Sequence, residues 1–450
     1  MKKTLILSSL MLASYFADAQ LSPAITSWLQ NTSVTGRHYV SGNSTPINDA
    51  TLVNVQTVQY SGNFVYASTK GIPAYVTGPF MDGNPSLATS QNAIFKFPLN
   101  PVQNTGTPTS TTMGNIGVFI NGVALFDYRD GVSYKNSTGA EAGGPLGGTG
   151  DGIWNRDAIV AERAGFDCSK GHPAMGNYHH HQNPSAYNLD LNVISTVCNL
   201  YAADGLYAID STQHSPLIGF AYDGFPIYGA YGYKNTNGTG GIARIRSSYY
   251  LRNITVRTHY ADGTNVTDGP PVNSTYFLGK YREDYEFIAN AQPEYLDAHN
   301  GRFCVTPEYP AGTYAYFATV DANWNSAYPY AVGPYFYGVK TAAKVTSITE
   351  SVTTYTPPAV GLQTNSITES NVGVFPNPAN DIIAVQVGNI NKEDVQVQLY
   401  DINGKLIKES VIYQGTTIAY FDVQTLYDGI YIVKVIKGAG VVNRKVVIRK

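Results

Sequence analysis

Apolar and polar residues alternate in short runs along most of the chain, and glycine, proline or asparagine separates one run from the next. Alternation with a period of two residues is typical of β-strands that have one buried face. It predicts strands over residues 51–58, 62–66 and 312–317. Helical spacing is limited to the short segment 159–163. The pattern therefore predicts a mainly all-β protein.

Two segments share the pattern of a β-hairpin. Residues 116–126 place Asn121-Gly122 between two apolar runs, and residues 218–228 place Asp223-Gly224 in the same way. An Asn-Gly or Asp-Gly pair in this position is the strongest short-range hairpin signal. Because the two segments match in register, we interpret them as related hairpins that sit symmetrically about the residues between them. The alternative is that any hairpin with this turn type shows the same pattern.

Histidines gather between the two hairpins. The stretch 165–198 contains four of the 8 histidines of the chain. If the backbone is extended there, His179 and His181 share one face and His180 lies on the other. A turn marked by a glycine and a proline could bring His172 back as a third nitrogen ligand. Three protein ligands with an open fourth position are typical of catalytic metal sites.

The predicted cofactor is a transition metal, copper or zinc, because imidazole ligands without thiolates suit these ions. Its main ligand candidates are His172, His179 and His181. His214 and His299 are candidates for a fourth ligand or for a supporting group. The competing interpretation is that the imidazoles form hydrogen bonds within a tyrosine-rich core.

Two carboxylates are candidates for catalytic roles. Asp223 and Asp297 could orient a ligating histidine or act as a general base. Each also has a structural alternative, since aspartate is common in turns and caps. The sequence carries no nucleotide-binding loop, no hydrolase elbow and no His-Glu-x-x-His motif.

Residues 1–19 predict a signal peptide. Two lysines precede an apolar run, and a small-residue pattern predicts cleavage before Gln20. The apolar run is too short to cross a bilayer as a helix, and we expect no transmembrane segment elsewhere. The mature protein is then expected to leave the cytoplasm.

Export permits disulfide bonds, and the 3 cysteines allow one bridge. Cys168 and Cys198 flank the histidines, and we expect them to pair and to leave Cys304 as a buried free thiol. The alternative is a bridge to Cys304 with Cys168 as a metal ligand. Closing the loop between the flanking pair would stabilise the fold by about 3 to 4 kcal/mol.

Composition supports an exported β-protein and excludes other classes. Hydrophobic residues make up 43% of the chain, which excludes disorder for its bulk. The 35 tyrosines and the low charged content of 14% favour many half-buried strands. A formal charge of -3 provides no basic surface for nucleic acid.

The chain of 450 residues is too long for one ordinary core, so we expect at least two domains. Residues 341–370 predict a linker, because serine and threonine dominate and the sequence Ser-Ile-Thr-Glu-Ser occurs twice. Residues 371–450 predict a compact β unit with a turn at Asn403-Gly404. Its expected strands are 382–387, 395–400, 417–421, 429–435 and 445–448.

The histidine stretch resembles a known family. Tyr178-His179-His180-His181 is similar to the tetrapeptide of the YHYH-domain proteins, with His180 where the family has tyrosine. The similarity runs from about Lys70 to about Gly338 and implies an irregular β-sandwich-like domain. With an N-terminal β extension, we place this domain at residues 20–340. His180 is expected to compete as a ligand or to stand in solvent.

The C-terminal unit resembles the type A sorting domain of the type IX secretion system. The resemblance rests on Pro376-Asn377-Pro378, Tyr400-Asp401-Ile402-Asn403-Gly404-Lys405, Gly429-Ile430-Tyr431 and Lys445. It implies a small immunoglobulin-like β-sandwich at residues 371–450, a Bacteroidetes-type host and handling by the type IX secretion machinery. It also implies removal of the domain, with lipopolysaccharide attachment or release of the rest.

Two functions are compatible with these patterns. The first is a secreted or outer-membrane surface protein whose histidine cluster binds a metal, as part of a metal-dependent enzyme. The second is a non-catalytic protein for adhesion or for capture of glycans or metal, with a structural histidine cluster. Carboxylates beside an accessible ion would favour the enzyme, and a saturated coordination sphere would favour the binding protein.

Overall fold

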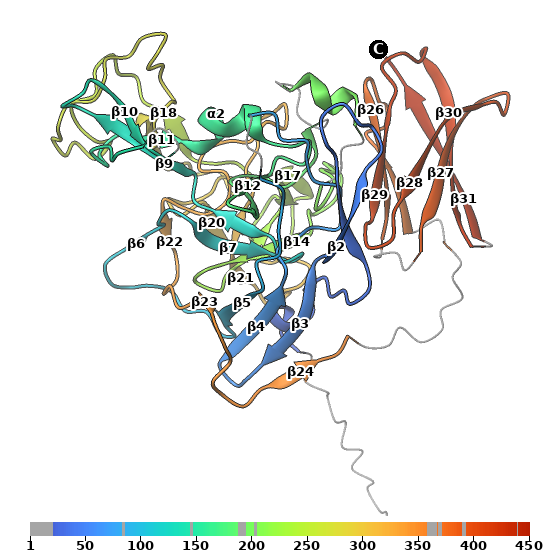
Figure 1. Ribbon diagram of the computed structural model, residues 1–450, viewed down its shortest axis with the longest axis horizontal. Coiled ribbons are helices and arrows are strands. Elements are labelled where there is room, and N and C mark those ends of the chain that lie inside the picture. The colour runs from blue at the N-terminus through green and yellow to red at the C-terminus, as the bar shows by residue number, and fades with distance from the viewer. Residues whose placement is uncertain are drawn as a thin grey trace, which may run out of the picture.

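The computed structural model contains two β-rich units (Figure 1). The described residues are 21–82, 86–144, 147–187, 195–201, 205–357, 367, 371–388, 393–438 and 440–450. The expected signal peptide, residues 1–19, lies outside them. We call residues 21–357 the main body and residues 371–450 the C-terminal unit. Strands make up most of the regular structure in both, which confirms the prediction of a mainly all-β protein.

The main body is built around an eight-stranded sheet with the strand order β12-β13-β8-β7-β14-β15-β21-β20. Its strands are β7 (Asn115–Phe119), β8 (Ala124–Phe126), β12 (His172–Ala174), β13 (Asn177–His180), β14 (Leu217–Ala221), β15 (Pro226–Tyr228), β20 (Gly301–Cys304) and β21 (Thr313–Phe317). The two predicted hairpins are β7–β8 and β14–β15, and they pair with each other through β7 and β14. The expectation that they flank the histidine stretch is wrong: they lie side by side, and the histidine strands lie at one edge.

The pairing pattern reads the same from both ends of this sheet. β13 runs parallel to β8, and β21 runs parallel to β15. The outermost pairs, β12–β13 and β20–β21, are both antiparallel. The sheet therefore consists of two halves related by an approximate two-fold axis between β7 and β14. We call the half with β12 and β13 the first half and the half with β20 and β21 the second half.

Glycine lies at equivalent positions on both sides of this axis. A Cβ atom on Gly117 would lie 2.9 Å from the carbonyl oxygen of Phe220. A Cβ atom on Gly219 would lie 2.7 Å from the carbonyl oxygen of Val118. The close approach of the two hairpins therefore requires glycine at both positions.

Replacing Gly117 with alanine is expected to lower the free energy of unfolding by about 1 to 3 kcal/mol, because the new methyl group overpacks the joint between the halves. Urea denaturation measures this change. Gly62→Ala is the matched control, since no atom lies within 4 Å of a Cβ there. Equal stability of the two variants would contradict the close-approach argument.

A five-stranded sheet with the order β23-β5-β4-β3-β24 packs against the central sheet. Its strands are β3 (Val55–Tyr60), β4 (Phe64–Thr69), β5 (Ala93–Pro98), β23 (Ala343–Val345) and β24 (Thr353–Tyr355). The ring of Trp28 joins the two sheets, because it lies 5.6 Å from Phe97 and 5.4 Å from Phe220 between ring centroids.

The outer strands of this sheet come from the segment that we expected to be a linker. β23 pairs with β5 and β24 pairs with β3, so part of residues 341–370 belongs to the main body. Threonine and valine favour strands, and an edge strand needs a partner on one side only. A polar, threonine-rich sequence is therefore compatible with an edge strand as well as with a linker.

Smaller elements cover the ends of the central sheet. These are α1 (Pro23–Thr26), β1 (Thr35–His38), β2 (Ile47–Leu52), β6 (Thr109–Ser110), β9 (Arg129–Lys135), β10 (Ala140–Gly143), β11 (Asn155–Asp157), α2 (Ala158–Glu162), η2 (Arg163–Gly165), η4 (Thr196–Asn199), β16 (Tyr231–Tyr233), β17 (Ile242–Arg244), β18 (Tyr249–Leu251), η5 (Arg282–Asp284), β19 (Tyr285–Phe287) and β22 (Tyr335–Phe336). The helix α2 follows β11 directly and lies beside β9 (Figure 1). Asp157 caps its start by accepting hydrogen bonds from the backbone of Ile159 and Val160.

The C-terminal unit is a β-sandwich. One sheet has the order β25-β26-β29 and the other has the order β28-β27-β30-β31. Their strands are β25 (Val372–Phe375), β26 (Ile382–Val387), β27 (Val395–Asp401), β28 (Leu406–Ile412), β29 (Ile418–Asp422), β30 (Gly429–Lys437) and β31 (Gly440–Ile448). Val385, Leu399 and Val433 come from the two sheets and are fully buried in a core of their own.

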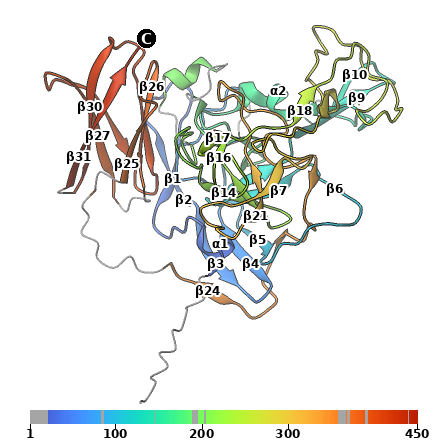
Figure 2. The ribbon, with the colours of Figure 1, turned by 180° about the vertical axis from the view of Figure 1, so that it is seen from behind.

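The C-terminal unit docks on one side of the main body (Figures 1 and 2). The guanidinium group of Arg37 in β1 lies 3.9 Å from the ring centroid of Tyr413. A groove of about 380 Å³ between the units is lined by Tyr39 and Val76 on one side and by Tyr420 on the other. Aromatic side chains therefore supply much of the contact between the units.

Candidate metal centre

The hairpin β12–β13 brings three histidines together. His172 and His179 face each other across the antiparallel pair, and His181 follows two residues later. Met175 and Gly176 form the turn with φ angles of 51° and 82°, as a tight type I′ turn requires. One ligand atom from each of the three histidines lies within 4.8 Å of the other two.

Backbone carbonyls fix the rings of two of these histidines. Nδ1 of His179 lies 2.9 Å from the oxygen of Asn177, and Nδ1 of His181 lies 2.5 Å from the oxygen of Asp127. A carbonyl oxygen only accepts, so both Nδ1 atoms carry the hydrogen. In the neutral rings the two Nε2 atoms are then unprotonated, and they lie 3.1 Å apart. Two lone pairs at this distance repel each other unless a proton or a cation lies between them.

Glu162, the last residue of α2, lies beside two of the three histidines. Its Oε2 atom lies 3.2 Å from Nε2 of His172 and 3.2 Å from Nε2 of His181. Despite these short distances, neither nitrogen of His172 nor Oε2 of Glu162 has a hydrogen-bond partner of acceptable geometry in the described part of the chain. Four ligands of a tetrahedral zinc ion, each about 2.0 to 2.1 Å from it, lie about 3.3 Å from one another. Three spacings are close to this value: His179 to His181, and Glu162 to His172 and to His181. The set of candidate ligand atoms that all lie within 4.8 Å of one another contains the three histidines and not Glu162.

The sequence does not single out Glu162 as a site residue. It precedes His172 by ten residues and lies on a helix, so no strand pattern links the two. The available signal was Asp157, a residue type that starts helices, before the segment with helical spacing. It indicates a helix beside the histidine stretch but not which side chain faces it.

Aromatic rings enclose the histidines. The ring of Phe126 stacks on His179 with centroids 3.9 Å apart, and Phe166 meets His172 edge-on at 4.9 Å. The side chain of Glu162 remains 24% exposed, whereas that of His172 is 9% exposed. Solvent therefore reaches the group from the side of Glu162.

Burial and mutual contacts shift the pKa values of the group. Burial, together with the neighbouring His181 and His172, lowers the pKa of His179 well below its usual value. Burial also opposes a charge on His181, but Glu162 outweighs it and raises the pKa of His181. Burial opposes ionisation of Glu162, yet its contacts with His172 and His181 hold its pKa below the usual range. The group as a whole therefore favours one positive charge beside an ionised Glu162.

The sequence model of one protein family, described as YHYH protein, matches residues 94–329 and so covers more than half of the chain. The chain belongs to the YHYH protein family. The matched region, which we call the YHYH domain, contains the three histidines, Glu162 and both halves of the central sheet. No curated protein matches the chain.

A second family model, the secretion system C-terminal sorting domain, matches residues 373–449. It confirms the second resemblance and identifies the chain as a type IX-secreted protein of Bacteroidetes type, directed to the cell surface or the extracellular space. Asn377 of the Pro-Asn-Pro motif contacts β31, because its side chain donates to the oxygen of Lys445 and accepts from the nitrogen of Val447.

Among the described residues, no helix has the length and apolar character needed to cross a membrane.

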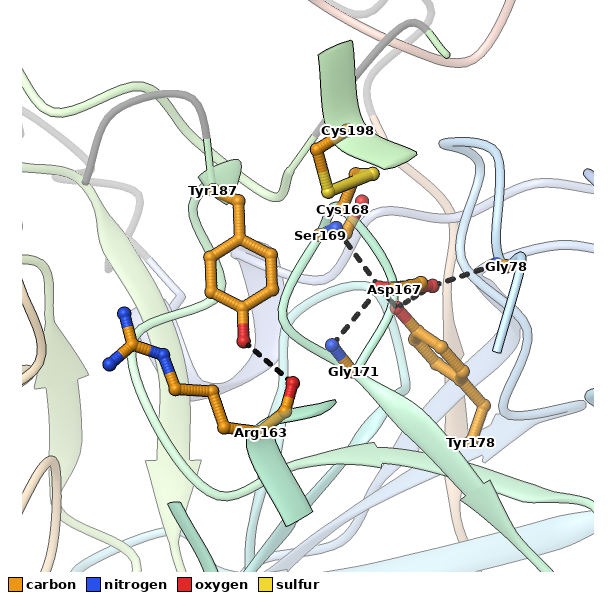
Figure 3. The surroundings of a disulfide bond; sticks show 9 residues. All are labelled: Gly78, Arg163, Asp167, Cys168, Ser169, Gly171, Tyr178, Tyr187 and Cys198. Carbon is orange, nitrogen blue, oxygen red and sulfur yellow. Dashed lines mark hydrogen bonds between the residues drawn. A yellow bond between two sulfur atoms is a disulfide. The ribbon is translucent and has the colours of Figure 1, made fainter. Parts of the chain in front are cut away.

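The disulfide of the YHYH domain joins Cys168 to Cys198, as expected, with Cα atoms 5.3 Å apart (Figure 3). Cys304 is buried and free. The alternative pairing, in which Cys304 is bridged and Cys168 ligates a metal, is therefore wrong.

A buried carboxylate next to the disulfide organises the turn before β12. Asp167 accepts hydrogen bonds from the backbone nitrogens of Gly78, Ser169 and Gly171 (Figure 3). It also accepts from the hydroxyl of Tyr178, at 2.9 and 3.1 Å. A Cβ atom on Gly171 would lie 2.4 Å from this hydroxyl, so the turn fits closely over the tyrosine. This arrangement positions β12 and therefore His172.

The second half of the YHYH domain repeats this turn. Asp297 accepts hydrogen bonds from the backbone of Gly301 at 3.2 Å and from the hydroxyl of Tyr314 at 3.0 Å. The residues before the two glycines, Lys170 and Asn300, both have a φ angle of 64°. The two halves thus share the turn and the buried Tyr-Asp pair as well as the hairpin.

The second half has other residues at the positions of His172, His179 and His181. The turn and the strand register make Arg302, Ala315 and Phe317 the equivalents of His172, His179 and His181. The guanidinium group of Arg302 donates to the carbonyl oxygens of Pro293 and Tyr233, both at 2.5 Å. A fixed positive charge therefore lies where the first half has its imidazoles.

The remaining candidates from the sequence lie in the second half. They are His214, His299, Asp223 and Asp297, and within the described residues none belongs to the group of candidate ligands. His214 contacts the rings of Tyr228 and Tyr233, and Nδ1 of His299 donates to the carbonyl oxygen of Tyr335. Asp223 accepts a hydrogen bond from Tyr316 at 2.6 Å and from the backbone of Gly338 at 2.8 Å. The structure thus gives both aspartates structural contacts away from His172.

His180 is neither a competing ligand nor exposed, so both expectations for it are wrong. It is buried on the opposite face, where Nδ1 donates to the oxygen of Lys170 and Nε2 accepts from the hydroxyl of Tyr75. Burial lowers the pKa of His180 to about 3, which keeps it neutral. Its equivalent in the second half is Tyr316, the residue type that the family has at this position.

Proposed function

We propose that the YHYH domain binds one transition metal ion, zinc or copper, through His172, His179 and His181, with the carboxylate of Glu162 beside His172 and His181. The observation that supports this most is the pair of Nε2 atoms of His179 and His181. Both Nδ1 atoms donate to carbonyls, so the neutral rings present two lone pairs to each other at 3.1 Å. A cation between them removes the repulsion and also neutralises Glu162.

The donor set suits zinc and copper, because imidazole and carboxylate ligands are common for both. A metal ion held here could polarise a substrate oxygen or lower the pKa of a bound water. Glu162 is the side chain of this site that solvent reaches, and it ends a helix of only five residues. Glu162 would therefore be placed to act as a general base beside a bound ion, a role for which the sequence offers Asp223 and Asp297 as candidates.

The alternative without a metal is an ion pair. His181 would carry a proton on Nε2, donate it to Glu162 or His179, and make the cluster a structural element of a surface binding protein. The raised pKa of His181 favours this state when no ion is present. Metal content separates the two interpretations.

The test is elemental analysis of residues 20–450, purified from the periplasm without chelating resin, before the sorting domain is removed. We expect about one equivalent of zinc or copper in the parent and almost none in His179→Ala/His181→Ala. His299→Ala is the matched control, since this histidine lies outside the group, and it should keep the metal. A parent that holds no metal after exposure to excess ion and dialysis would overturn the proposal.

For secretion, we propose that residues 1–19 are removed during export and that the sorting domain, from about residue 371, is removed at the surface. Attachment to lipopolysaccharide would then hold the YHYH domain, with its N-terminal strands, at the outer membrane. The match to the sorting-domain family supports this route.

A further inference from the structure

A second concave site lies in the second half of the YHYH domain and shares no residue with the histidine cluster. It is a cleft of about 430 Å³ at the tips of the β14–β15 and β20–β21 hairpins, bounded also by α1 and the segment after β5. Figure 2 shows α1, β5 and β21 close to one another in this region. A volume of this size lies in the range of small-molecule sites.

Aromatic rings form the floor and one wall of the cleft. Tyr314 and Tyr337 stack with centroids 3.5 Å apart, and Phe225 meets both rings edge-on at 5.4 Å. Asp297 fixes the hydroxyl of Tyr314, so the floor is rigid. Phe303, on the edge strand β20, is 63% exposed beside it. The protein thus presents a large apolar ring to solvent next to a preformed aromatic surface.

The polar lining of the cleft is neutral. Asn100 and Gln103 are exposed at its rim, and Ser22 and Thr313 add hydroxyl groups. Among the residues that the structure describes, no aspartate, glutamate, lysine, arginine or histidine lines it. Amides and hydroxyls both donate and accept hydrogen bonds, whereas an ionic ligand would have no counter-charge here.

The described part of the first half has smaller side chains at two of the equivalent positions. The equivalents of Phe225 and Phe303 are Val123 and Pro173, and both are buried. The two halves therefore differ in what they carry: the first half carries the histidine cluster, and the second half carries the aromatic cleft.

We propose that this cleft binds a neutral oligosaccharide. A hexose ring has C–H faces that stack on aromatic rings and a belt of hydroxyls that matches amide and hydroxyl side chains. A protein directed to the cell surface or the extracellular space meets such glycans. The inference does not depend on a metal, because the cleft contains none of the candidate ligands.

The test is isothermal titration calorimetry of the mature full-length chain with cellohexaose, mannohexaose, hexagalacturonic acid and decaproline. We expect at least one neutral hexasaccharide to bind with a Kd below about 1 mM, and the acidic sugar and the peptide to bind at least about tenfold more weakly. Phe303→Ala should weaken binding at least about tenfold, because truncating an exposed aromatic anchor removes much of the contact. Asn100→Ala/Gln103→Ala, which changes only exposed side chains, should weaken it as well.

Phe277→Ala is the control for Phe303→Ala, since Phe277 is 43% exposed and lies outside the cleft. It should bind like the parent. A chelator should leave saccharide binding unchanged, which separates this proposal from the metal site. The proposal is wrong if neither neutral hexasaccharide binds at about 5 mM, if decaproline binds better, or if Phe303→Ala binds as tightly as the parent.

Discussion

Removal of the proposed metal ion is expected to lower the free energy of unfolding of the chain by about 4 kcal/mol, for a free metal concentration about 1,000 times the Kd. The physical reason is the geometry of His179 and His181. Without an ion their Nε2 lone pairs face each other at 3.1 Å, and one ring must take up a proton to relieve the repulsion. Thermal unfolding followed by tyrosine fluorescence, with and without a chelator, measures the difference.

The matched variant for this experiment is His179→Ala/His181→Ala. It removes both opposed nitrogens, so a chelator should change its unfolding temperature by little. A parent that unfolds at the same temperature in chelator and in excess metal would contradict the predicted linkage. A shift of equal size in the variant would assign the effect to another site.

The sequence predicts those features of the central sheet that depend on a local pattern. Alternation along Tyr178 to His181 predicts which imidazoles share a face, and the structure has this arrangement. The Asn121-Gly122 and Asp223-Gly224 pairs mark both hairpins, and Gly122 and Gly224 have positive φ angles. Asn121 and Asp223 do not, so the type I′ turn that such pairs favour is wrong here. Each of these predictions depends on residues within one hairpin.

The sequence did not predict contacts between elements that are far apart along the chain. Glu162 reaches the histidines from a helix, and periodicity says nothing about which helix end faces which strand. His180 looked like a surplus ligand because its partner, Tyr75, is 105 residues away. Its pairing with Tyr75 required knowledge of the fold.

The internal duplication was only partly recognised. The hairpins repeat with a constant spacing of 102 residues, but the turns at Asp167 and Asp297 are 130 residues apart. Insertions of different length between matching elements hide such a repeat in the sequence. The signal that was available is the short pattern Asp-x-x-x-Gly, which is followed in both halves by Tyr-x-His or Tyr-x-Tyr on the next strand.

The duplication also explains why one half can carry a metal site. In the second half the guanidinium group of Arg302 supplies a permanent positive charge, and its two terminal nitrogens donate to backbone carbonyls. In the first half three imidazoles and Glu162 lie at the equivalent place. The positive charge that balances the carboxylate of Glu162 must there come from a proton or from a metal ion. A fold that tolerates a buried cation in one half is compatible with a bound cation in the other.

Replacing Cys168 and Cys198 with alanine is expected to lower the free energy of unfolding by about 3 to 4 kcal/mol, because the bridge closes a loop with a sequence separation of 30 residues. We nevertheless expect the double variant to keep its metal. The second half provides the reason: Ala298 occupies the position of Cys168, and the turn at Asp297 keeps the same hydrogen bonds without a disulfide. Urea denaturation and elemental analysis of the same preparation measure both quantities.

Cys304→Ala is the control, since this buried thiol takes part in no disulfide and its loss should cost much less stability than loss of the bridge. If the double variant remains folded but loses the metal, the disulfide and not the Asp167 turn positions His172. If it keeps the metal and loses the expected stability, the turn alone positions the ligands. The bridge then acts mainly by restricting the unfolded chain around the site, which is a role suited to a protein that leaves the cell.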